Sequence, residues 1–312
     1  MQYPRKIQIG FQEGTCPLRC RKCPGFGEHA KKVKENKKMS LEQSKRLIDE
    51  MARMEVVPTV QPHIITEPFA NEDLKEIIPY CCSKGMTLSI ITNGILLDKA
   101  WMDFLIEQLN RNSTISFSLD AVTQETYEKV RGKYSLFELE KKIEYLVDYR
   151  GDKGGGPRVG VSFVYEEDNY KEQDAFLEKW KDKVDVVRFN VALDEKGKVP
   201  SVFKTQEVVK DAAGCPYVQE TMVIDADGEV RVCCRDAFGV TSLGNVFEEG
   251  ILAVWNGDKR KLLLQRQKED LLYQRDFCFE CEWGYALYNF SETETKDYII
   301  NSADYAVYYN RK

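Results

Sequence analysis

Three cysteines near the N-terminus have a spacing typical of a metal site. Cys16, Cys20 and Cys23 stand in the segment GTCPLRCRKCP, residues 14–24. Thiolates this close in sequence can converge on one metal centre, and cysteines hold iron–sulfur clusters in this way. Zinc suits this set poorly, because a fourth Cys or His at ribbon spacing is missing. A cubane cluster with three protein thiolates keeps one iron open, and an open iron can bind a substrate or a cofactor.

A second group of cysteines lies near the C-terminus. Its four members are Cys215, Cys233, Cys278 and Cys281. Four thiolates would close a cluster, which can then transfer electrons but cannot bind a substrate directly. Zinc also takes four thiolates and remains an alternative for this group. Cys81 and Cys82 end an apolar helical pattern, so we interpret them as small core residues.

Composition excludes several classes of partner. The 312 residues carry a net charge of -6, from 45 basic and 51 acidic side chains, so we expect no nucleic-acid or anionic-lipid partner. No apolar run approaches the roughly 18 residues of a membrane span, and residues 1–6 lack the apolar core of a signal peptide. The 10 cysteines are far below the roughly 8–10% of a disulfide scaffold. We therefore expect a cytoplasmic protein without a membrane segment, whose thiols are free or metal-bound.

Strand-like and helical patterns alternate over the first 190 residues. Strands are expected at residues 6–12, 60–66, 86–92, 113–119, 159–164 and 184–190. Helices are expected at residues 40–54, 71–84, 98–109, 136–149 and 170–181. Ser40 and Gln43 form a capping box at the start of the first helix. This alternation predicts an α/β fold with a parallel sheet, wound as an open or partial barrel. Binding groups gather at the C-terminal strand ends of such sheets, where the first cysteine loop would lie.

The remaining segments are built differently. The glycine-rich residues 151–157 precede a strand rather than a helix, so we interpret them as a connection and not as a phosphate site. Residues 192–214 are polar and mark a domain boundary. Residues 221–225 and 229–233 flank an Asp-Gly turn and predict a hairpin, followed by helices near residues 251–255 and 259–268. Tyr305, Tyr308 and Tyr309 fit one face of a helix in the tail.

The first cysteine loop and the alternating elements resemble the radical S-adenosylmethionine (SAM) superfamily. In that family three cysteines hold a [4Fe-4S] cluster whose open iron binds SAM, and one electron then releases a 5'-deoxyadenosyl radical. The resemblance implies a partial (β/α)6 barrel over residues 1–195. It also implies a reducing partner such as flavodoxin or ferredoxin.

Polar residues at later strand ends match further motifs of this family. The TEP of residues 66–68 stands where the family's GGEP motif holds the methionine amino group, although both glycines are absent. TNG follows the third strand, and SLD ends the fourth, where a polar pair lies near the ribose and carboxylate. The cofactor-binding residues implied are Thr66, Glu67, Thr92, Asn93, Ser118 and Asp120. Lys22 departs from the family pattern, which usually places an aromatic residue or His there to pack on adenine.

The C-terminal cysteines resemble those of the twitch domain, a shortened form of the SPASM domain. Gly228 precedes Cys233 by the family's interval, and residues 243–263 resemble its LGN…WN stretch. The resemblance implies a small α+β domain at residues 196–285, in which the four cysteines hold one auxiliary [4Fe-4S] cluster. No cysteine follows Cys281, so a second auxiliary cluster is not expected. The chain would then carry two [4Fe-4S] clusters and SAM, with residues 286–312 forming a tail that packs on the barrel.

This layout predicts hydrogen abstraction from a carbon centre, followed by one of two outcomes. The substrate radical can be oxidised through the auxiliary cluster, or it can be epimerised by a hydrogen atom from the other face. Cys234 is the candidate hydrogen donor, and the alternatives are a structural cysteine or a ligand exchanged with Cys233. Strand alternation is expected to point these two neighbours to opposite faces.

Two other places could contribute to a substrate pocket. Arg188 in the sixth strand is a candidate catalytic residue, as a substrate-anchoring cation or proton acceptor, although a solvated or ion-paired arginine is the alternative. Tyr165, Glu166 and Glu167 follow the fifth strand and could line a pocket or simply face solvent.

The leading hypothesis is an oxidoreductase or epimerase acting on a polar small molecule, a sugar or aminocyclitol of an antibiotic or other natural-product pathway. The alternative from the same superfamily is a peptide-modifying maturase. The cluster motif begins at residue 16, which would leave no room before it for a leader-binding domain. An alternative of another class is a non-catalytic zinc-binding module.

Overall fold

The chain folds as a mixed α/β protein whose secondary structure forms two compact units. The computed structural model describes residues 2–27, 35–191, 215–236, 238–269, 271, 278, 291–303 and 306–312. The first unit combines Met1–Cys16, Lys32–Ile90 and Gly214–Glu280. The second combines Pro17–Lys31, Ile91–Ala213 and Cys281–Lys312. The predicted boundaries at residues 195 and 285 fall outside the described residues and remain a prediction.

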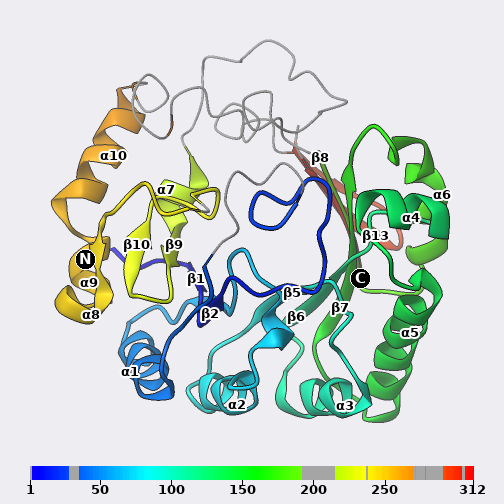
Figure 1. Cartoon of the computed structure of the whole chain (residues 1–312), viewed down its shortest axis with the longest axis horizontal. Coiled ribbons are helices and arrows are strands. Elements are labelled where there is room, and N and C mark those ends of the chain that lie inside the picture. The colour runs from blue at the N-terminus through cyan, green and yellow to red at the C-terminus, as the bar shows by residue number, and fades with distance from the viewer. Residues whose placement is uncertain are drawn as a thin grey trace. The chain divides into compact units, whose positions relative to one another are not determined.

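The sheet of the first unit has the order β11-β10-β9-β1-β4. Its strands are β1 (Lys6–Ile9), β4 (Thr59–Gln61), β9 (Thr221–Ile224), β10 (Glu229–Arg231) and β11 (Gly244–Asn245). Strand β1 pairs in parallel with both β4 and β9, so the predicted C-terminal hairpin extends the sheet that begins at the N-terminus (Figure 1). Leu88 adds a parallel bridge to Val60, which continues the order of the predicted barrel.

The sheet of the second unit has the order β12-β13-β14-β8-β7-β6-β5. Its predicted strands are β5 (Ser89–Thr92), β6 (Thr114–Ser118), β7 (Arg158–Tyr165) and β8 (Val186–Val191). Strands β6, β7 and β8 are parallel, as expected for crossover connections through helices. The six strands predicted for the partial barrel are therefore all present, in chain order.

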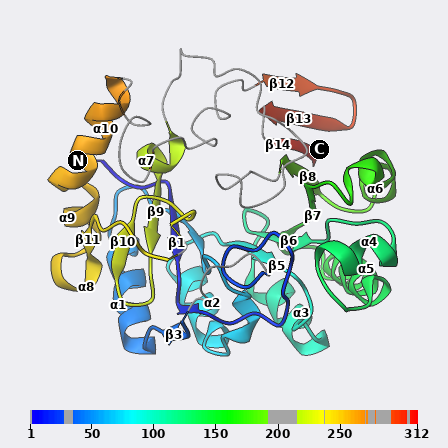
Figure 2. The ribbon, with the colours of Figure 1, turned by 45° about the horizontal axis from the view of Figure 1, so that its top comes forward.

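The described residues of the tail form strands, so the predicted tyrosine helix is wrong. Strands β12 (Ser291–Glu294), β13 (Tyr298–Ala303) and β14 (Ala306–Arg311) form an antiparallel ribbon, and β14 pairs with β8. Figure 2 shows this ribbon at the end of the β8–β7–β6 sheet. Tyr308 and Tyr309 are neighbours in a strand and therefore point to opposite faces, while Tyr305 lies outside the described residues. The β-favouring Val and Tyr residues of AVYYNR were the signal for a strand.

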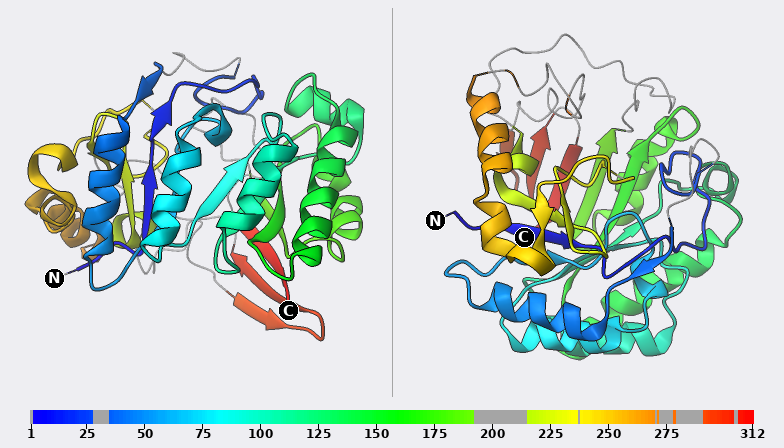
Figure 3. Two further views of the ribbon diagram at one scale, coloured as in Figure 1. Left: turned by 90° about the horizontal axis from the view of Figure 1, so that it is seen from below. Right: turned by 60° about the vertical axis from the view of Figure 1, so that its left-hand side comes forward.

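The long helices agree with the sequence-based expectations to within a few residues. They are α1 (Leu41–Ala52), α2 (Leu74–Ser83), α3 (Lys99–Gln108), α5 (Leu136–Asp152) and α6 (Gln173–Trp180). Within the second unit, Figure 3 shows α3, α5 and α6 beside the strands of the sheet. The capping box is confirmed, because the Gln43 amide donates to Ser40 Oγ at 3.1 Å and the Ser40 amide donates to Gln43 Oε1 at 3.0 Å.

Shorter elements complete the described chain. Two short strands are β2 (Gln12–Glu13) and β3 (Lys37–Lys38), and two 3-10 turns are η1 (Pro68–Ala70) and η2 (Tyr170–Glu172). The C-terminal helices are α7 (Pro216–Glu220), α8 (Val246–Glu249), α9 (Ile251–Trp255) and α10 (Asp258–Lys268). Helix α4 (Gln124–Val130) was not predicted, because its seven residues are too few for a clear period. The Glu172 carboxylate fixes its start by accepting from the Thr123 and Thr126 hydroxyls, at 2.8 and 2.7 Å.

The core of the second unit lies between its sheet and its helices. Phe163 of β7 and Phe189 of β8 are fully buried, and both pack against Phe176 of α6. Since side chains alternate along a strand, Ser162 and Arg188 lie on the opposite face of the same strands. That face carries these polar side chains, whereas the helix-covered face carries the buried aromatic ones. None of the helices within the described ranges is long and apolar enough to cross a membrane.

Candidate functional site

The loop that carries the second and third cysteines is tightly turned. The Cys23 amide donates to the Cys20 carbonyl at 2.9 Å, and the Gly27 amide donates to the Cys23 carbonyl at 2.9 Å. A Cβ at position 27 would lie 2.5 Å from the Cys20 carbonyl oxygen, so only glycine fits there. Cys20 is buried and Cys23 is half-buried. Burial raises the pKa of the Cys23 thiol, so a bound metal must supply the charge that favours its thiolate.

The donor chemistry of this loop fits an iron–sulfur cluster. Cys16, Cys20 and Cys23 form no disulfide, and neither do the other described cysteines. Within the described ranges, no three His, Cys, Asp or Glu side chains gather closely enough to hold a single metal ion. In a cubane cluster each ligated iron takes its own thiolate, so the sulfur atoms do not need to meet at one ion. Soft thiolate ligands are also those that iron–sulfur clusters select.

The segment after β4 holds the chain just before Cys16. The Thr66 hydroxyl donates to the Thr15 carbonyl at 2.6 Å, and the Glu67 amide donates to the same carbonyl at 2.8 Å. The Glu67 side chain is 3% exposed, and its carboxylate accepts from the Phe69 amide at the start of η1. The two residues predicted from the TEP motif therefore anchor the first cysteine's loop.

Thr92 and Asn93 shape a rigid turn at the end of β5. The Thr92 hydroxyl accepts from the Gly94 amide at 2.9 Å, and Asn93 Oδ1 accepts from the Ile95 amide at 3.0 Å. Gly94 has φ +75°, and a Cβ there would lie 2.8 Å from the Phe117 ring. Both predicted side chains are buried beside the polar end of the neighbouring strand β6.

Asp120 lies just after β6 at the centre of a buried set of charges. Its side chain is fully buried, and it has φ +60°, a left-handed conformation that Asp tolerates better than most residues. The carboxylate accepts from the Val164 amide at 2.7 Å and from Arg131 Nη1 at 2.9 Å, and it lies 3.0 Å from Lys22 Nζ. Burial would raise the pKa of Asp120, but Lys22 and Arg131 hold it below its ordinary value. Sequence reasoning missed Arg131, which follows the unpredicted helix α4.

Ser118 and Arg188 lie on the polar face of the second sheet. Ser118 Oγ accepts from Ser162 Oγ at 3.4 Å, and Arg188 stands opposite Ser162 in the register of β7 and β8. Arg188 Nε donates to Asn190 Oδ1 at 2.7 Å, and its guanidinium carbon lies 5.0 Å from the centre of the Tyr308 ring. Within the described part of the chain, its terminal nitrogens form no hydrogen bond or ion pair, so they can receive an anionic or carbonyl group.

The C-terminal cysteines belong to short connecting segments. Cys215 is the residue before α7, whereas Cys233 and Cys234 follow β10, which ends at Arg231. The expectation that strand alternation separates Cys233 from Cys234 is therefore wrong, because neither residue lies in a strand. Burial raises the pKa of the Cys234 thiol, which forms a hydrogen bond with Tyr217. Cys278 is half-buried, and Cys281 lies outside the described residues.

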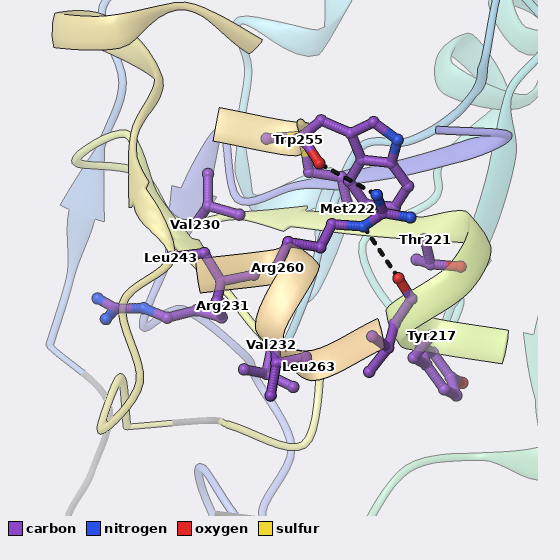
Figure 4. A pocket seen from close by; sticks show the side chains of 11 residues that line it. Tyr217, Thr221, Met222, Val230, Arg231, Val232, Leu243, Trp255, Arg260 and Leu263 are labelled. Carbon is purple, nitrogen blue, oxygen red and sulfur yellow. Dashed lines mark hydrogen bonds between the residues drawn. The ribbon is translucent and has the colours of Figure 1, made fainter. Parts of the chain in front are cut away.

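A small cavity beside these segments is a packing feature and not a binding site. It measures about 10 Å³, enough for at most one water molecule, and Tyr217, Met222 and Trp255 are among its walls. Figure 4 shows Arg260 across it, donating to the carbonyls of Val218 and Trp255 at 3.0 and 3.1 Å. Burial lowers the pKa of Arg260 to about 10, and its guanidinium carbon lies 3.5 Å from the centre of the Trp255 ring. Arg260 thus joins α7, α9 and α10.

Comparison with known families identifies the two parts of the chain. The radical SAM superfamily matches residues 14–179, which include the first cysteine loop and the strands β4 to β7. The chain belongs to the radical SAM superfamily. An iron–sulfur cluster-binding domain of the SPASM type matches residues 215–282, which span all four C-terminal cysteines. Membership implies a SAM-binding [4Fe-4S] cluster and SAM as cofactors, and the SPASM domain implies auxiliary iron–sulfur chemistry.

Curated relatives of this radical SAM protein act in different pathways. The antilisterial bacteriocin subtilosin biosynthesis protein AlbA of Bacillus subtilis is 26% identical over 229 residues, covering 64% of this chain and 50% of AlbA. The Fe-coproporphyrin III synthase of Methanosarcina barkeri is 30% identical over 166 residues, covering 52% of this chain and 38% of the synthase. The chain thus spans half or less of the length of these relatives.

Solved structures share the fold at low sequence identity. BtrN in complex with AdoMet and 2-DOIA has a TM-score of 0.62 at 16% identity, covering 90% of this chain and 94% of BtrN. Streptococcus suis SuiB bound to S-adenosylmethionine has a TM-score of 0.65 at 16% identity, covering 90% of this chain and 71% of SuiB. Both likenesses support the predicted barrel followed by a small SPASM-type domain.

Proposed function

We propose that this radical SAM enzyme abstracts a hydrogen atom from a carbon centre of a polar small molecule, a sugar or aminocyclitol of a natural-product pathway. The observation that supports this proposal is the polar face of β7 and β8. There Arg188 presents terminal nitrogens without a partner in the described chain, beside Ser162 and Asn190. A hydroxylated or amino substrate would exchange its hydration for these side chains.

The cofactor contacts are proposed residue by residue. When bound, the cluster held by Cys16, Cys20 and Cys23 supplies, together with SAM, the 5'-deoxyadenosyl radical. The buried Glu67 would accept hydrogen bonds from the methionine amino group, with Thr66 fixing the segment on which Glu67 lies. Asn93 and Thr92 would keep the adjacent turn rigid, and Ser118 would contact the ribose. The Asp120 carboxylate already accepts from three donors, so Asp120 would affect SAM binding by positioning Arg131 and not by direct contact.

The C-terminal domain would hold one auxiliary [4Fe-4S] cluster. Cys215, Cys233, Cys278 and Cys281 are its proposed ligands, and a flavodoxin or ferredoxin would reduce the N-terminal cluster. The described cysteines form no disulfide, which agrees with a reducing compartment, so we propose a cytoplasmic location.

Two outcomes of the reaction are open to this chain, and an isotopic experiment separates them. An oxidoreductase would pass an electron of the substrate radical to the auxiliary cluster and a proton of the substrate to a base. An epimerase would return a hydrogen atom from a thiol, for which Cys234 is the candidate. Reaction in deuterium oxide should place deuterium at the inverted carbon in the wild type and not in Cys234→Ala. Deuterium incorporation by Cys234→Ala would exclude the thiol donor, whereas a product two electrons more oxidised would establish the oxidoreductase.

Peptide modification is the second candidate function. The supporting observation is that AlbA acts in bacteriocin biosynthesis by its name, and that another relative, 28% identical over 164 residues, is the PqqA peptide cyclase of Granulibacter bethesdensis. Incubation of the reconstituted enzyme with peptides encoded beside its gene tests this candidate. A mass change in such a peptide, with no turnover of sugars or aminocyclitols, would replace the first proposal.

A further inference from the structure

Lys22 occupies an unusual position for a lysine. It lies between two cluster cysteines, yet its side chain is only 13% exposed. Its ammonium nitrogen lies 3.0 Å from Asp120 Oδ2 and 3.2 Å from Glu166 Oε1, and it donates to the Val164 carbonyl at 3.3 Å. Lysine is almost never buried unless it is paired, so this inward orientation is held by specific partners. The side chain that would face a cofactor from this position instead points into the protein.

Lys22 and its neighbours Asp120, Glu166 and Arg131 form a group whose four charges sum to zero. Asp120 is fully buried, and Glu166 is 4% exposed. Arg131 is the second cation and lies 2.9 Å from the same Asp120 oxygen that faces Lys22. Two cations therefore balance two carboxylates. Removal of one member leaves a buried charge without compensation, which costs far more than the loss of a surface pair.

This group joins three segments of the second unit. Lys22 belongs to the cluster loop, Asp120 follows β6, and Glu166 follows β7. A backbone bond adds to the connection, since the Arg21 amide donates to the Val130 carbonyl at the end of α4, at 3.3 Å. Because β6 and β7 are parallel neighbours, their carboxyl ends offer a rigid edge to which a loop can be fixed. The loop's conformation is then set before any cofactor binds.

We infer that Lys22 is a positioning residue that fixes the Cys20–Cys23 segment and the Asp120–Arg131 pair through buried ion pairing. The inference rests on the proposed function only for its consequence, the affinity for SAM. Position 22 then makes no contact with adenine, and the preorganised loop lowers the ordering cost of binding SAM.

Three variants of the full chain, with Lys22→Tyr as a fourth, test this inference after anaerobic reconstitution. Lys22→Met removes the cation, and Lys22→Met with Glu166→Gln restores the charge balance. Arg21→Met is the matched control, because Arg21 is the adjacent residue and pairs with Asp168 while its own side chain is 34% exposed. The readouts are amide hydrogen exchange at residues 20–27, SAM affinity by equilibrium dialysis, and the change in the reduced cluster's EPR spectrum on addition of SAM.

We expect Lys22→Met to speed exchange at Arg21 and Cys23 and to weaken SAM binding by roughly tenfold or more, because it leaves a buried carboxylate unpaired. The double variant should recover most of both effects, and Arg21→Met should resemble the wild type. Equal effects of Lys22→Met and Arg21→Met, or a double variant no better than Lys22→Met, would overturn the inference. So would tighter SAM binding by Lys22→Tyr, since that result would place position 22 against adenine. If the wild type binds no SAM, the proposed function fails, while the exchange data still decide the role of Lys22.

Discussion

The hydroxyl of Thr66 donates a hydrogen bond to the carbonyl of Thr15, and the two oxygen atoms lie 2.6 Å apart. This contact ties the segment after β4 to the residue that precedes Cys16. The TEP motif therefore has a structural role in addition to its proposed role in SAM binding. This role does not require the two glycines of the family motif that are absent here, because the hydrogen bond is made by the Thr66 hydroxyl.

Replacement of Thr66 by valine should loosen the first cysteine's loop. Valine keeps the shape and removes the donor, so the unfolding free energy should fall by about 1 kcal/mol. Iron retention after reconstitution, measured per chain, should fall as well. Thr59→Val is the matched control, because it removes a 3.0 Å hydroxyl contact with Thr87 within the same unit but away from the loop. Equal iron retention in both variants would contradict the anchoring role.

Arg188 should act in substrate binding. Arg188→Met should raise KM by roughly 10- to 100-fold with a smaller change in kcat, because a charge-assisted hydrogen bond to the substrate is lost. Arg158→Met serves as the control, since Arg158 lies in the same sheet and donates to Asn310 Oδ1 and the Asp185 carbonyl. Steady-state kinetics with the identified substrate check the prediction. An unchanged KM would contradict this role and would show that Arg188 serves only as a structural partner of Asn190.

His63 should make the fold sensitive to acid. Its side chain is 4% exposed, and burial lowers its pKa to about 4, below the ordinary value of 6.5. As the pH falls, the unfolded chain therefore binds a proton at His63 before the folded chain does. The free energy of unfolding decreases progressively between pH 6.5 and 4. The loss should amount to roughly 3 kcal/mol. Denaturant titrations of wild type and His63→Gln at several pH values measure it; parallel pH profiles would show that His63 does not contribute.

Local sequence patterns predicted most of the fold. The capping box of Ser40 and Gln43 placed α1, and the β-rich runs predicted all six barrel strands. Strands β1 and β4 end three and five residues before their predicted ends. The cysteine spacings identified both iron–sulfur regions without structural information. These signals are short-range, and the chemistry that they encode does not depend on tertiary contacts.

The errors and omissions concern contacts between residues distant in the chain. Helix α4 is short, and its start depends on Glu172, which lies about 50 positions later in the chain. The tail tyrosines were assigned to a helix, although β14 is fixed by its pairing with β8. The inward direction of Lys22 could not be predicted either, because Asp120 and Glu166 reach it only after β6 and β7 have formed.

We propose above all that the N-terminal cysteines hold the cluster that cleaves SAM. Anaerobic reconstitution, reduction with dithionite and quantification of 5'-deoxyadenosine test it most directly. The wild type and the buried-cysteine control Cys81→Ala should carry about eight irons per chain and form 5'-deoxyadenosine. The combined variant Cys16→Ala, Cys20→Ala and Cys23→Ala should retain about four irons and form none. Stoichiometric zinc with no SAM cleavage in the wild type, or undiminished cleavage in the combined variant, would contradict this account.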